Sequence, residues 1–244
     1  KSNSNGALLL SGPSTYTGVT SVLGGELRFT SIANVGGGAS SLGAPTNTTD
    51  GTIQLNNGGM IVYKTGGSAT SDRAVNIGSG AGQISVSGFS SANTTLTLSG
   101  GITGSGQLTL RGNTSALSHF EESGVIAIGN NTIQVLNTVT ATLSNNSNTF
   151  TGKLFMNGGQ VTVTSINSAS GVNSAAGAGS ILSFAGGGTL VYTGTGVTSN
   201  RTVELATNST GNVTIDQSGA SGALKFTTDL SNAGSAAQAN AKTL

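Results

Sequence analysis

The sequence predicts an all-β chain coiled into a parallel β-solenoid, and three observations carry that prediction. The passage at residues 14–32 returns at residues 148–166 with most of its pattern intact. Apolar residues occur in short bursts of period two, separated by Gly, Asn and Ser, which is the pattern of strands and turns. Only 7% of the residues are charged, so outward strand positions carry Thr, Ser, Asn and Gly, which suit flat stacked faces.

The repetition extends well beyond those two passages. The first motif positions match at an offset of 134 residues, whereas Thr70–Arg73 matches Thr198–Arg201 at an offset of 128. We expect the loop at residues 45–50 to hold the length difference, because surface loops tolerate it best. Self-similarity at a long offset is typical of stacked units that complete each other's core. The matched motif positions are Thr15, Tyr16, Thr17, Gly18, Gly24 and Gly25, and then Thr149, Phe150, Thr151, Gly152, Gly158 and Gly159.

These matches predict the domain organisation. We expect one solenoid over residues 1–244, with an internal duplication of residues 7–106 and 141–234 and a connector at 107–140 that has no matched partner. Rungs of about 20–25 residues would give about eleven rungs.

Each expected strand is a burst of alternating apolar residues that can point into such a core. Glycine pairs at the strand edges supply the positive φ that a sharp turn needs. Helical periodicity is not sustained over a helix length, and the Ala-rich stretch 233–241 is the one helix-tolerant segment. In chain order the strands are expected around residues 27–29, 53–55, 75–77, 84–86, 96–98, 108–110, 126–128, 133–135, 161–163, 203–205, 213–215 and 224–226.

Charge and hydropathy exclude two classes of partner. The nine basic and eight acidic residues are spread singly and give a net charge of +1. The sequence therefore lacks the basic cluster that would predict nucleic-acid binding. The longest apolar runs fall far short of the ~18 residues of a membrane-spanning helix. The sequence has no cysteine, which fits export into an oxidising space. It opens at Lys1 rather than Met, so we expect a processed form or a fragment.

The motif residues carry a family resemblance. Residues 6–18, followed by Gly24, Gly25 and Leu27, resemble the passenger-associated repeat of bacterial autotransporters, and residues 143–152 with Gly158 and Gly159 match it again. The resemblance implies a right-handed parallel β-helix at the bacterial cell surface, with an adhesive or structural role. It implies an extracellular location and export through a C-terminal barrel. Nothing in this chain reads as that barrel.

Catalytic chemistry has little support in the sequence. Some β-helix proteins are polysaccharide lyases or hydrolases, which need clustered carboxylates. Glu121 and Glu122 are the one adjacent pair, and neighbours on a strand point to opposite faces. With His119 they suggest either a sugar- or metal-binding patch or, as we expect, a solvated loop. We therefore predict no catalytic, cofactor-binding or metal-binding residues, no cofactor and no enzymatic activity, with a polysaccharide-active enzyme as the alternative.

Two further patterns have both a functional and a structural interpretation. Tyr16 and Phe150 occupy equivalent places and could be stacking platforms for sugars, but we expect each ring to close a Gly-Gly turn of the next rung. Repeated Thr-x-Thr pairs are typical of ice-binding solenoids, but here their spacing is irregular and Thr is a good strand residue in any case. The sequence therefore predicts a surface adhesin segment that stacks end to end and contacts a host or surface glycan or protein.

Overall fold

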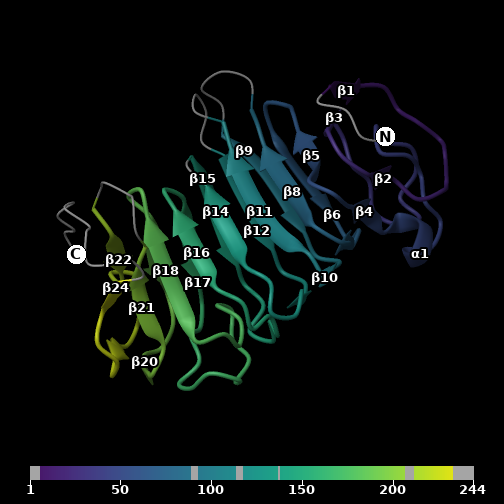
Figure 1. Ribbon diagram of the computed structural model, residues 1–244. Helices are drawn as coiled ribbons and strands as arrows, with labels where there is room; N and C mark the ends of the chain where they lie inside the picture. The colour runs from purple at the N-terminus through teal and green to yellow at the C-terminus, as the bar shows by residue number, and fades with distance from the viewer. Residues whose placement is uncertain (1–5, 89–92, 114–117, 137, 207–211, 233–244) are drawn as a thin grey trace.

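The computed structural model is an all-β parallel β-solenoid, as the sequence predicts. It describes residues 6–88, 93–113, 118–136, 138–206 and 212–232. Within these ranges every strand pairing is parallel, and successive strands progress along one direction from β1 to β24 (Figure 1). The Ala-rich stretch 233–241 lies outside the described residues.

The solenoid has three walls, and its complete rungs place one strand in each wall in turn, whereas the rungs of β1–β5 and β14–β18 lack a strand in one wall. The ten-stranded sheet holds β1 (Ala7–Leu10), β3 (Glu26–Phe29), β5 (Gly59–Tyr63), β8 (Ala81–Val86), β11 (Gln107–Gly112), β14 (Ile133–Leu136), β16 (Leu154–Asn157), β18 (Ile181–Ala185), β21 (Thr202–Leu205) and β24 (Ser231–Asn232). The seven-stranded sheet holds β6 (Ser68–Ser71), β9 (Thr94–Leu98), β12 (Ser118–Glu122), β15 (Val139–Leu143), β17 (Gln160–Val163), β19 (Thr189–Tyr192) and β22 (Thr214–Asp216).

The third wall is divided. Its five-stranded part holds β2 (Ser21–Val22), β4 (Ile53–Leu55), β7 (Val75–Ile77), β10 (Ile102–Gly104) and β13 (Ile126–Ala127). Further along the chain, the separate two-stranded sheet of β20 (Val197–Ser199) and β23 (Leu224–Phe226) takes the same place between the seven-stranded and ten-stranded sheets.

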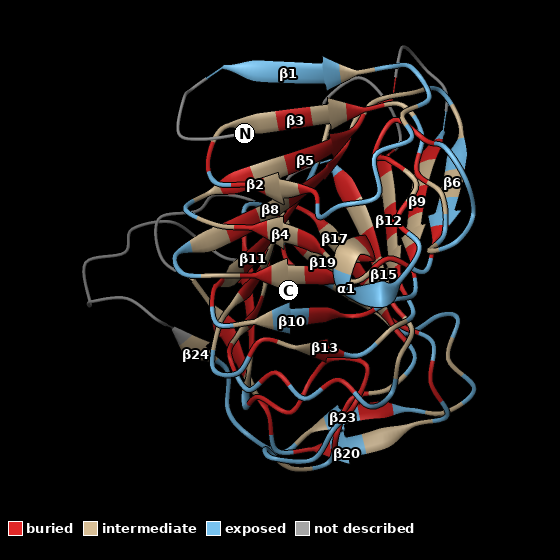
Figure 2. Cartoon of the chain, turned by 90° about the vertical axis from the view of Figure 1, so that its right-hand side faces the viewer, coloured by how far each residue is buried: buried red, intermediate tan, exposed pale blue. Residues whose placement is uncertain are grey.

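The core consists of stacked apolar columns. Successive side chains on a strand alternate between the interior and solvent, and the in-register ladders place apolar residues one above another. One such column of the ten-stranded sheet runs through Leu27, Ile61, Ile84, Leu110, Val135, Met156, Phe184 and Leu205. Burial is therefore shared between neighbouring rungs, and β1, at the N-terminal end, is exposed (Figure 2).

Two long loops interrupt the walls. Residues 30–52 lie between β3 and β4, and residues 164–180 lie between β17 and β18. The first loop includes the expected loop at 45–50 and forms one helical turn, α1 (Thr48–Gly51), with Asn47 as its N-cap. Each loop sends apolar residues, Leu42 and Ala176 among them, into the core.

The structure does not confirm every sequence-based expectation. The sheets hold ten, seven and five strands, so the expected eleven rungs are not confirmed, and the right-handed sense of the coil stays a prediction. Residues 107–140 have no sequence counterpart, yet β11, β12, β13 and β14 continue the walls in register. The expectation that Glu121 and Glu122 lie in a solvated loop is wrong, because both belong to β12.

Matched passages of the two copies lie on different walls. β3 lies in the ten-stranded sheet, whereas its sequence counterpart β17 lies in the seven-stranded sheet. β6 lies in the seven-stranded sheet and its counterpart β20 in the two-stranded one. The two copies therefore form the same succession of strands and loop. Each of these strands of the second copy, however, lies on the next wall of the solenoid relative to its counterpart in the first copy.

Candidate functional site

A polar groove lies on the outer surface of the ten-stranded sheet, across β14, β16, β18 and β21. Its hollow measures about 320 Å³ and is lined by Gln107, Thr132, Gln134, Lys153, Phe155, Ser183, Glu204 and Ala206. An adjoining hollow of about 310 Å³ shares Thr132 and Lys153 with it. The residues that line the two hollows range from 107 to 206 in the sequence. The coiling of the chain brings their side chains together.

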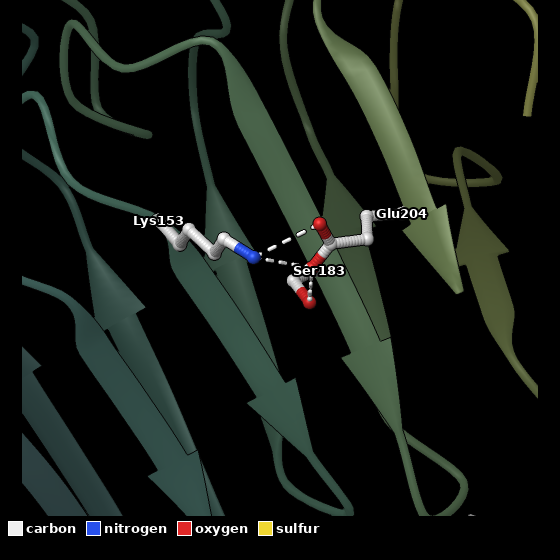
Figure 3. A network of polar contacts seen from close by, with 3 residues as sticks. All are labelled: Lys153, Ser183 and Glu204. Carbon is white, nitrogen blue, oxygen red and sulfur yellow. Dashed lines mark hydrogen bonds and ion pairs between the residues drawn. The ribbon is translucent and has the colours of Figure 1, made fainter. Parts of the chain in front are cut away.

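An ion pair spans the groove. Lys153 Nζ lies 2.7 Å and 2.9 Å from the two carboxylate oxygens of Glu204, and the Ser183 hydroxyl donates to the same carboxylate at 2.7 Å (Figure 3). Burial alone would raise the pKa of Glu204, but the hydrogen bonds from Lys153 and Ser183 and the charge of Lys153 outweigh it and lower that pKa. Glu204 is therefore an ionised, well-oriented acceptor.

An aromatic ring and two amides complete the groove. Gln134, Phe155 and Ser183 face outward in one column of the sheet, in register on neighbouring strands. Gln107 donates to the Gln134 amide oxygen at 3.1 Å. Phe155 is half-buried and stands on an outer face, where it fills no core.

The sequence duplication supplies an internal comparison for the groove. The column Phe155–Ser183–Glu204 has its counterpart in Ser21–Gln54–Asn76, which forms an equivalent column on the five-stranded sheet. Lys153 corresponds to Val19. The copies therefore share the scaffold, and the second copy alone places an aromatic ring and an ion pair on it.

The repeat-motif residues do not gather at one site, although two of them lie next to the groove. Thr151 and Gly152 line the adjoining hollow, and a side chain on Gly152 would meet the Asn131 carbonyl oxygen at 2.0 Å. Gly24, Gly25 and Gly158 have positive φ values at tight turns. The remaining motif residues do not converge with these: Thr15, Thr17, Gly18 and Thr149 are exposed, and Gly159 packs against β14.

Tyr16 and Phe150 pack against glycines of the long loops. The Phe150 ring is fully buried, and a Cβ on Gly177 would lie 2.5 Å from it. A Cβ on Gly43 would likewise lie 2.7 Å from the Tyr16 ring. The rings therefore pack as expected but against Gly43 and Gly177, which lie in the loops, rather than against a Gly-Gly turn.

We expect Gly177→Ala to destabilise the chain by about 2 kcal/mol or more, because its methyl group would clash with the Phe150 ring and φ is +78°. Gly171 is the matched control, since its φ is +87° and nothing lies within 4 Å of its Cβ position. Gly171→Ala therefore reports backbone strain alone. Equal urea midpoints for the two variants would contradict the packing role of Phe150.

Comparison with known proteins finds a relative that matches part of the chain. The adhesin BmaC autotransporter of Brucella suis biovar 1 (strain 1330) is 45% identical over 100 residues, which is 41% of this chain and 3% of that protein. The chain is similar to an autotransporter adhesin. The predicted resemblance is thereby confirmed, and it supports an extracellular or cell-surface location. No family model and no solved structure matches the chain.

The chain spans a small part of that autotransporter. Among the described residues, no helix is long and apolar enough to cross a membrane.

Two buried arginines hold the solenoid scaffold, and the sequence analysis assigned them no role. Arg201 is fully buried and donates to the Asn167 side chain and to the carbonyl oxygens of Ala176 at 2.9 Å and Gly177 at 2.5 Å. Burial lowers its pKa to about 10, so it stays charged at neutral pH. The signal available was the exact repetition of Ser-x-Arg in a chain with nine basic residues.

Arg73 is the counterpart of Arg201 in the first copy. It is fully buried and donates to the carbonyl oxygens of Gly51 at 2.7 Å and Leu42 at 2.5 Å. Burial lowers its pKa, and the charges of Tyr16 and Asp72 offset part of that effect. Each arginine therefore fastens one long loop from inside the core.

Glu121 and Glu122 point in opposite directions. Glu121 is half-buried on the outer face, and Glu122 is 1% exposed. In the ladder Glu122 stands between Leu98 and Leu143. One carboxylate oxygen accepts from Gly124 N at 2.8 Å, and the other has no hydrogen-bond partner among the described residues. Burial raises the pKa of Glu122 to about 8, although the backbone N–H groups of Gly124 and Gly101 oppose that rise.

Proposed function

We propose that the chain is an adhesive and structural segment of a bacterial cell-surface protein. In this proposal it forms one solenoid over residues 1–244, with copies 7–106 and 141–234 and the connector 107–140. The observation that carries the proposal is the parallel β-solenoid itself, whose outer face presents a polar groove, together with the similarity to an autotransporter adhesin. Its partner is a host or surface glycan or protein.

The mechanism is geometric. Stacked rungs make a stiff support, so groups from distant parts of the sequence hold fixed positions without a conformational change on binding. The polysaccharide-active enzyme alternative is not supported, because the adjacent carboxylates of Glu121 and Glu122 are split between the surface and the core.

The adhesive role is tested with beads coated with the whole chain and applied to host-cell monolayers. We expect more attachment than with beads coated with the heat-unfolded chain, since the groove exists only in the folded solenoid. Attachment no greater than that of the unfolded control would contradict the adhesive role.

We also propose end-to-end self-association as a finer step. At the N-terminal end β1 pairs with β3 alone among the described strands, and Leu8 is 47% exposed. At the C-terminal end Val213, Ile215, Leu224 and Phe226 line a hollow of about 330 Å³. A projecting apolar strand and an apolar hollow at opposite ends suit head-to-tail stacking by strand addition.

Sedimentation at increasing protein concentration tests this step. We expect larger species to form in wild type and to be lost in Leu8→Asp, with Val172→Asp as an exposed control away from the ends. A single species at every concentration would refute self-association and leave the adhesive role standing.

A further inference from the structure

We propose that the groove on the ten-stranded sheet binds a neutral oligosaccharide, with Phe155 as the stacking platform. This inference rests on the proposed function, because it names the ligand class of the same face. Sugars present apolar C–H faces surrounded by hydroxyl groups, so their sites combine an aromatic surface with hydrogen-bonding side chains.

The position of Phe155 is the first argument. Its neighbours in the outward column are Gln134 and Ser183, so an apolar ring stands in a polar column. The inward neighbours Leu154 and Met156 already fill the core below it. A half-buried aromatic ring on a polar outer face is suited to contact a ligand.

The hydrogen-bonding groups around the ring are the second argument. The bond between Gln107 and Gln134 uses one amide nitrogen and one amide oxygen. Among the described residues, the Gln107 oxygen and the Gln134 nitrogen have no further partner, so they leave an acceptor and a donor in the groove. Thr132 extends the lining into the second hollow, where Asn130 and Ser180 add an amide and a hydroxyl.

Charge selects a neutral ligand. Lys153 is the cation of the groove, and Glu204 neutralises it through two contacts. An acidic sugar would have to displace that carboxylate, which Ser183 also holds. A neutral sugar can hydrogen-bond to the pair without separating it, and charge-assisted hydrogen bonds are among the stronger ones.

The first copy shows that the scaffold does not require these side chains. Ser21 stands where the second copy has Phe155, and Asn76 stands where it has Glu204. Both columns are built by the same local fold. The aromatic ring and the ion pair are thus present in the second copy alone, and the fold of the column does not account for them.

A printed array of neutral and uronic-acid-containing oligosaccharides, probed with the whole chain, tests the proposal. We expect retention on neutral oligosaccharides, and calorimetric titration of the best-bound one should show binding that raised salt barely weakens. Phe155→Ala should weaken that binding about tenfold or more, as truncating a central aromatic contact does. Gln134→Ala should weaken it to a smaller extent.

Met60→Ala is the matched control, because Met60 faces outward in the same column, on β5, away from the groove. Its binding should equal that of wild type. Asn76→Ala, on the counterpart column, should likewise change nothing.

Three results would overturn the proposal: no retained neutral oligosaccharide, a preference for the acidic ones, or neutral binding that Phe155→Ala leaves intact. Bead attachment lost in Phe155→Ala without any glycan binding would indicate a protein ligand, which sinks this inference and leaves the proposed function. Neutral glycan binding without cell attachment would support this inference and contradict the proposed adhesive role.

Discussion

Replacing Glu122 with leucine is expected to stabilise the chain strongly at pH 8 and to remove most of its pH dependence between about pH 5 and 8. The pKa of Glu122 is raised from 4.5 to about 8 in the folded chain. At ~1.4 kcal/mol per pH unit, that shift corresponds to at most about 5 kcal/mol. Since domains are stable by only ~5–15 kcal/mol, the effect is large.

The direction follows from the proton balance. Below pH 4.5 the carboxyl is protonated in both states, and the folded chain has its full stability. As pH rises towards 8, the unfolded chain loses this proton while the folded chain keeps it, so the free energy of unfolding falls. Leu98 and Leu143 flank the site, so a leucine there continues the column, and Glu122→Gln should also flatten the pH profile.

Glu121→Gln is the matched control, because it removes the same charge from the outward side of the same strand. Urea unfolding followed by circular dichroism across pH 4.5–9 is the measurement. The control should keep the wild-type slope. A wild-type stability that rises between pH 5 and 8, or a slope that survives Glu122→Leu, would show that this carboxyl is not buried as described.

Removing the Arg201 side chain is the second change with a large expected effect. Arg201→Ala leaves the Asn167 side-chain oxygen and the Ala176 carbonyl oxygen without their buried donor, whereas the Gly177 carbonyl oxygen keeps its hydrogen bond from Ser174. At ~1–3 kcal/mol for each unsatisfied acceptor, we expect a loss of about 4 kcal/mol or more. Arg201→Lys keeps the charge but not the planar fork, so we expect an intermediate loss.

Because rungs interact with their neighbours only, the loss should be local before it is global. Hydrogen exchange should show opening of the loop at 164–180 in Arg201→Ala and of the loop at 30–52 in Arg73→Ala. Arg111→Ala is the control, since Arg111 is exposed and contacts Gln83 at the surface. Exchange that rises uniformly along the chain would contradict the local role.

The strands could be predicted from the sequence because their signal is local. Period-two apolar bursts mark β3, β4, β7 and most later strands, and glycine pairs mark the turns. Which wall a strand joins depends on the path of the preceding rungs, some of which skip one wall. The displacement of the second copy by one face therefore could not be read from the repeat.

The groove and the buried charges could not be predicted for a related reason. The groove gathers Gln107, Phe155 and Glu204 from three different rungs of the solenoid, and no spacing in the sequence connects them. Glu122 lies in the unmatched connector, so no second copy pointed to it. Arg201 did have a matched partner in Arg73, but burying an arginine without a carboxylate is rare enough that the sequence favours an exposed side chain.

Cysteine crosslinking tests the stacked parallel ladder most directly, since the chain has no cysteine of its own. Thr142 and Thr162 are direct partners on β15 and β17, so their cysteine pair lies within disulfide reach. Thr140 is two residues out of register with Thr162 and should be too distant. We expect oxidation to join Thr142→Cys with Thr162→Cys and to leave the Thr140→Cys pair reduced; equal crosslinking of both pairs, or crosslinking of the slipped pair alone, would contradict the solenoid.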